Sequence, residues 1–102
     1  MIQLDQHLTG MRGETLRDES GNPILLRWTL EECLIASYGN EDIDGKEKMK
    51  RFLLCRRIVD AKDETELKAE EIAKLKELIA KRFPTLLVGI VWNILDPAEG
   101  AN

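Results

Sequence analysis

The sequence has few aromatic residues and no long apolar run. Phe, Trp and Tyr make up 5% of its 102 residues. The longest apolar block, at 86–95, runs for about ten residues, whereas a membrane-spanning helix needs roughly twenty. The start, MIQLDQHLTG, lacks the basic region and apolar core of a secretory signal peptide. We therefore expect a cytoplasmic protein with no membrane partner.

The sequence also has little of what catalysis or nucleic-acid binding requires. Its 15 basic and 19 acidic residues give a net charge of −4, which disfavours nucleic acid as a partner because such binding draws on a basic surface. The single histidine, His7, has no adjacent Ser or Cys to activate. Cys33 and Cys55 lack metal-ligand spacing and are interpreted as small buried side chains in a reduced compartment, with a disulfide left open. We expect no catalytic residue, metal, cofactor or small-molecule substrate, and hence not an enzyme.

The first 28 residues are typical of strands and turns. Gly10, Gly13 and the run DESGNP at 18–23 are turn formers. Short segments that can pair as strands lie around these turns: 8–11, 15–17 and 24–26. The pattern predicts a β-hairpin with its tip at 20–22.

A change to helical signals follows at Thr29. The motif TLEE is a capping box with Thr29 as N-cap and Glu32 reaching back, so a helix is predicted over 30–38. The turn at Gly39–Asn40 ends it. Trp28, just before the cap, lies at the position where a hydrophobic residue packs against the start of the helix.

The second predicted helix, 45–61, has Asp44 as N-cap and Glu47 three residues later. Its apolar residues cover more than half of its circumference, so we expect contact on two sides: Met49, Phe52, Leu53, Cys55, Ile58 and Val59. Its basic residues are spread around the axis, which is typical of a solvated surface.

A third helix is predicted over 69–82, where apolar residues recur at spacings of three and four. Pro84 ends this helix and begins a last one, which Asp96–Pro97 closes. The sequence therefore predicts a single α+β domain over 1–102, mostly helical. It comprises a hairpin region (1–28), a helical region (29–96) and a loose tail (97–102).

The last helix is apolar on every side except at Gly89 and Asn93. Surface helices normally carry one apolar stripe and one polar face, so we expect this helix to be buried or to lie at an oligomer interface. Glycine costs about 1 kcal/mol in a helix interior, so Gly89 is expected to allow close approach of another backbone. Tryptophan is enriched at interfaces, and the candidate interface residues are Trp28, Leu86, Leu87, Gly89, Ile90, Trp92 and Leu95.

Most of the chain is covered by three segments: DESGNPILLRWTLEE, DGKEKMKRFLLCRRI and ELKAEEIAKLKELIAKRFPTLLVGIVWNIL. In these segments the sequence resembles a group of small proteins of similar length encoded among the morphogenesis genes of tailed bacteriophages and prophages. Lys68 departs from the pattern, where a capping Ser or Thr is expected. The resemblance implies a minor or helper component of virion assembly, of the tail or head–tail region, in the host cytoplasm or the virion. It transfers no functional residues.

We expect a phage or prophage protein that acts by binding other phage structural proteins and copies of itself. The alternative is a small regulator that binds nucleic acid through basic residues of the 45–61 helix: Lys48, Lys50, Arg51, Arg56 and Arg57. That alternative requires these side chains to converge on one exposed face.

Overall fold

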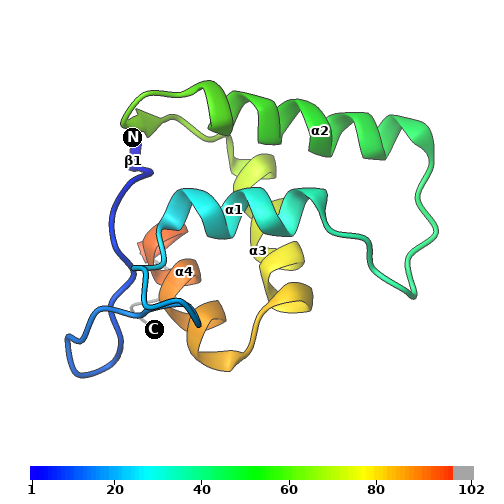
Figure 1. Ribbon diagram of the computed structural model, residues 1–102. Coiled ribbons are helices and arrows are strands. Elements are labelled where there is room, and N and C mark those ends of the chain that lie inside the picture. The colour runs from blue at the N-terminus through cyan, green and yellow to red at the C-terminus, as the bar shows by residue number, and fades with distance from the viewer. Residues whose placement is uncertain (98–102) are drawn as a thin grey trace.

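The computed structural model describes residues 1–97, which form four helices and one two-stranded sheet in an α+β, mostly helical fold, as predicted (Figure 1). In chain order the elements are β1 (Ile2–Gln3), α1 (Leu26–Ile35), α2 (Gly45–Asp60), β2 (Glu64–Thr65), α3 (Ala69–Arg82) and α4 (Thr85–Leu95). Among residues 1–97, no helix has the length and apolar character needed to cross a membrane. Apart from Pro97, the expected tail at 97–102 lies outside the described residues.

The segment between β1 and α1 consists of turns and isolated β-bridges. Arg17 bridges Pro23 across the turn at 18–22. Gly21 in this turn has a φ of 86°, a conformation that glycine adopts without strain. The predicted hairpin and its tip are therefore confirmed, although each paired segment is very short.

A closed ring of backbone hydrogen bonds holds this segment together. The N–H of Leu8 donates to the carbonyl of Ile24, and the N–H of Ile24 donates to the carbonyl of Leu16. The N–H of Leu16 then donates back to the carbonyl of Leu8. We call these three bonds the hydrogen-bond ring. It pairs backbone polar groups that would otherwise need water.

The sheet joins parts of the chain that the sequence did not connect. β1 pairs antiparallel with β2, with Ile2 opposite Thr65 and Gln3 opposite Glu64. Each strand has two residues, too few to show the alternating pattern by which strands are recognised.

α1 begins earlier and ends earlier than the sequence predicted. Thr29 is not the N-cap but a fully buried helical residue, whose hydroxyl donates to the Leu25 carbonyl at 3.1 Å. Starting at Leu26 places that leucine in the core. Burying a leucine contributes about 1.5–3 kcal/mol, more than the roughly 1 kcal/mol of an N-cap. Tyr38 lies beyond the helix, and its hydroxyl donates to the Cys33 carbonyl at 2.6 Å.

The other three helices lie close to their predicted limits. Asp44 caps α2 and accepts from the Glu47 N–H at 2.9 Å. α3 has the predicted bounds despite Lys68, because the Glu71 carboxylate accepts the Lys68 N–H at 2.8 Å. α4 follows Pro84 as expected.

The core lies where α1 passes between α2 and the pair formed by α3 and α4 (Figure 1). Every helix contributes a fully buried side chain, as does the segment before α1: Leu4, Leu8, Leu26, Leu30, Ile58, Leu75, Leu78, Ile79 and Val91. Cys33 and Cys55 are buried and free, as interpreted from the sequence. Burial raises the pKa of the Cys33 thiol to about 12, so it is protonated at neutral pH.

Candidate protein-binding surfaces

The outer face of α2 carries a row of exposed apolar side chains, which we call the α2 ridge: Met49, Phe52, Leu53 and Val59. Each is 51–56% exposed. Their spacing places them on one face of the helix, with Arg56 between them. The opposite face packs on α1 through buried residues that include Leu54 and Ile58. Within residues 1–97 the apolar residues of α2 are packed on one side, and the expected apolar contact on a second side is not made.

A groove runs along each flank of the α2 ridge. One, of about 540 Å³, is lined by Leu53, Lys50 and residues of α3. The other, of about 480 Å³, is lined by Phe52, Lys48 and the exposed Ile35 of α1. The N-terminal half of α2 is thus open on both flanks. Polar contacts must therefore fix its position against the rest of the chain.

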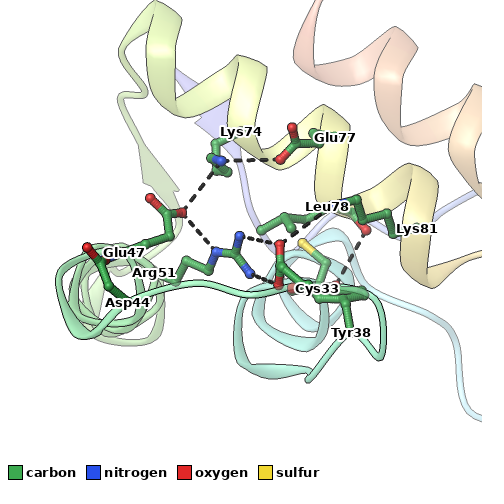
Figure 2. A network of polar contacts seen from close by, with 10 residues as sticks. Cys33, Tyr38, Asp44, Glu47, Arg51, Lys74, Glu77, Leu78 and Lys81 are labelled. Carbon is green, nitrogen blue, oxygen red and sulfur yellow. Dashed lines mark hydrogen bonds and ion pairs between the residues drawn. The ribbon is translucent and has the colours of Figure 1, made fainter.

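The buried guanidinium of Arg51 holds this half of α2 (Figure 2). The Arg51 side chain is 5% exposed. Its two terminal nitrogens donate to the Glu41 carboxylate at 2.8 and 2.7 Å, and its Nε donates to Glu47 at 2.9 Å. Paired N–H···O bonds of this kind are strong and fix direction. Arg51 therefore ties α2 to the loop that follows α1.

Lysines from α3 complete the network. Lys74 Nζ lies 3.5 Å from the Glu47 carboxylate, and Lys81 Nζ lies 3.5 Å from that of Glu41. The hydrogen bonds from Arg51 hold the pKa of Glu41 at about 2, and they also lower the pKa of Glu47. Both carboxylates are therefore ionised at neutral pH, and they link α2 to α3.

Arg27 holds the other end of α2. Its guanidinium donates to the carbonyls of Ile58 at 2.6 Å and Ala61 at 2.9 Å, and also to that of Lys62. It forms a two-bonded ion pair with Asp5 at 2.8 and 2.9 Å. These carbonyls lack partners within the helix, so Arg27 satisfies the C-terminal end of α2. With both ends fixed, α2 presents its ridge on a rigid element.

A second apolar surface lies between α4 and the loop at 6–11, and we call it the α4 groove. Its volume is about 660 Å³, and its lining includes Met11, Leu86, Gly89, Ile90 and Ile94. Met11 is 88% exposed and Leu86 is 41% exposed. The groove therefore offers apolar surface from two separate parts of the chain.

α4 is only partly enclosed by its own domain, so of the two expected alternatives, burial and an oligomer interface, burial accounts for one side of the helix. Within α4, the buried side chains are Val91 and Leu95. The space around Gly89 is also open, because a Cβ built there meets no atom of the described residues within 4 Å. No backbone in the described part of the chain thus approaches Gly89 closely, so the expected close approach is not made by residues 1–97.

The structure separates the predicted interface residues into groups. Leu86, Gly89 and Ile90 line the α4 groove, whereas Leu95 belongs to the core and Leu87 is half-buried. Trp92 is half-buried, and its indole N–H donates to the Lys76 carbonyl at 3.0 Å. Trp28 lies on α1, where its ring is 6.0 Å from that of Phe83.

The basic residues of α2 do not form one free face. Arg51 is buried against Glu41, and Arg57 pairs with Glu71 at 2.7 Å. Arg56 pairs with Asp60 at 3.2 Å. The two remaining residues of the predicted set, Lys48 and Lys50, line different grooves on either side of the α2 ridge. Nucleic-acid binding through this helix stays a prediction.

Comparisons with protein-family models, with curated proteins and with solved structures gave no match. Within residues 1–97, no group of three or more His, Cys, Asp or Glu side chains is placed to hold a metal ion. The surfaces of the chain, together with the sequence resemblance, are therefore the basis for a functional proposal.

Proposed function

We propose that this protein is a small assembly component of a tailed phage or prophage that acts by binding other proteins. The observation that carries the proposal is that residues 1–97 leave two apolar surfaces uncovered, the α2 ridge and the α4 groove. Contiguous exposed apolar surface on a folded domain is typical of a site of protein association. The resemblance to phage morphogenesis proteins supplies the biological setting.

The size of the α2 ridge sets what a partner must supply. Complete burial of a Leu, Phe or Met side chain contributes about 1.5–3 kcal/mol, so four half-exposed ridge residues contribute about 3–6 kcal/mol. Association costs about 4–15 kcal/mol in lost freedom of motion. One ridge alone is therefore marginal, and it needs an apolar counterpart and added polar contacts on the partner.

The α4 groove fits the apolar side chains of a partner segment. Helices that bind in grooves insert residues at spacings of three and four. The groove has room beside Gly89, because no described atom occupies the position of a Cβ there. We assign this groove to another protein of the particle.

Particle assembly tests the proposal. The gene is disrupted in the phage or lysogen that carries it, and the particles are counted by infectivity and examined by electron microscopy. We expect unjoined or incomplete heads and tails, with rescue by the wild-type protein but not by Leu86→Asp. Ser20→Asp is the matched control, because it adds the same charge at the exposed hairpin tip. Normal infectious particles without the gene would overturn the assembly role.

A further inference from the structure

We propose that the α2 ridge pairs with the α2 ridge of a second copy of this chain, with the two helices antiparallel around a two-fold axis beside Leu53. This inference rests on the proposed function, because it names the partner of one of the two surfaces. α2 forms one edge of the molecule, with α1 on its inner side (Figure 1). The ridge is therefore accessible along the length of the helix.

The spacing of the ridge residues is that of a seam between two helices. Met49, Phe52, Arg56 and Val59 follow one another at intervals of three and four, as in coiled-coil pairs. In an antiparallel pair centred beside Leu53, Met49 faces Val59 of the second copy, and the two Leu53 side chains meet. Met49, Leu53 and Val59 of each copy then each have an apolar neighbour on the other.

The arginine in the seam also has a partner in this arrangement. Arg56 of one copy lies against the Phe52 ring of the other, where a guanidinium is attracted to the ring face. In the single chain, Arg56 pairs with Asp60 at 3.2 Å, and both side chains are about 65% exposed. Exposed pairs of this kind contribute little, so Arg56 is free to turn toward a ring.

One pair of charges beside the seam favours the antiparallel orientation. On the flank of α2 that carries Leu53, the exposed Lys46 lies at the start of the helix and the exposed Asp60 lies at its end. The other exposed basic residues are spread along the helix and just beyond it: Lys48, Lys50, Arg56, Arg57 and Lys62. An antiparallel pair places Lys46 of each copy beside Asp60 of the other. A parallel pair would instead place Lys46 beside Lys46 and Asp60 beside Asp60. Antiparallel helices also align their dipoles favourably.

The sequence pattern of α2 gives the same indication. Its apolar residues cover more than half of the helix, but α1 covers one side. A second copy supplies the missing contact without any further type of partner. It also supplies the apolar counterpart that the ridge needs, because each ridge buries the other.

The test is the molar mass of the purified full chain by light scattering across a concentration series. We expect a dimer that dissociates on dilution, and we expect Leu53→Glu to be monomeric. Met11→Glu, which puts the same charge on the α4 groove, should leave the dimer intact. A monomeric wild type at every concentration, or a dimer lost in Met11→Glu but not in Leu53→Glu, would overturn the proposal.

A charge exchange tests the orientation. Lys46→Glu and Asp60→Lys are each expected to weaken the dimer about tenfold, because each replaces two ion pairs at the edge of the seam by like charges. The double variant should restore wild-type affinity. If the two single variants weaken the dimer and the double variant does not recover, the antiparallel register is wrong. These measurements use the purified chain alone, so their failure leaves the assembly role standing. Conversely, normal particles without the gene would leave the dimer standing.

Discussion

Replacing Arg51 by leucine should destabilise the fold more than any other change of an arginine to leucine in α2. The guanidinium is 5% exposed and makes three hydrogen bonds to two carboxylates. Removing one partner of a buried ion pair costs about 3–5 kcal/mol. Glu41 and Glu47 retain some contact with water and keep their α3 lysines, so we expect a loss of about 2–4 kcal/mol.

The assay is urea unfolding followed by circular dichroism at pH 7. Arg56→Leu is the matched control, because this arginine lies on the same helix but is 65% exposed with one ion pair. We expect the control to change the free energy of unfolding by about 0.5 kcal/mol or less. Both variants are made in the Leu53→Glu background, so that association does not contribute. Equal losses in the two variants would refute the argument that burial makes the Arg51 network important.

The difference in free energy of unfolding between wild type and Arg51→Leu should also depend on pH. The pKa of Glu41 is about 2 in the folded protein, below its ordinary value of 4.5. Its contribution to stability is therefore present above about pH 4.5 and is lost as the pH falls toward 2. Without Arg51 the pKa of Glu41 rises, and less stability remains to be lost. The gap between wild type and Arg51→Leu should narrow between pH 4.5 and pH 2, and a constant gap would contradict this account.

Three further predictions concern other parts of the molecule. Arg27→Met should lower the free energy of unfolding by about 2–4 kcal/mol, because the carbonyls at the end of α2 lose their charged hydrogen-bond donor. Hydrogen exchange should then show this end of α2 opening first. Gly89→Ala should stabilise the fold by about 0.5–1 kcal/mol, since the added methyl group meets no described atom; a lower melting temperature would show that the space is not free. The wild-type protein should not retard DNA or RNA in a gel shift at low salt. Retardation that is lost in a Lys48→Glu, Lys50→Glu variant would instead favour the nucleic-acid alternative.

Local signals were sufficient to predict three of the four helices described in residues 1–97. Asp44 caps α2 through a bond to a residue three positions away, and the limits of α3 follow from its apolar spacing and from Pro84. The predicted start of α1 was wrong because burial of Leu26 in the core contributes more than the N-cap that Thr29 offers in the sequence. The pairing of β1 with β2 has no local signal, since it depends on how α1 and α2 place the chain.

The candidate surfaces were predicted in part. The excess of apolar residues around α2 indicated a second contact, and the ridge is where that contact is missing. The apolar pattern of α4 left burial and an interface open, and the core takes Val91 and Leu95 of α4 beside leucines from α1, α3 and the N-terminal segment. Sequence spacing alone did not reveal the role of Arg51, because only Glu47 has the i,i+4 spacing of a helical pair and Glu41 lies in the loop before α2.

The hydrogen-bond ring has a consequence for the α4 groove. Leu8, Leu16 and Ile24 each donate one bond and accept one, so the loss of any one of the three bonds opens the circuit. The loop bearing Met11, which forms one wall of the groove, leaves and rejoins this circuit between Leu8 and Leu16. The backbone amides of Leu8, Leu16 and Ile24 should therefore exchange with solvent as one cooperative unit. A single opening event would then both expose these amides and remove a wall of the groove, so partner binding there should slow the exchange of all three together.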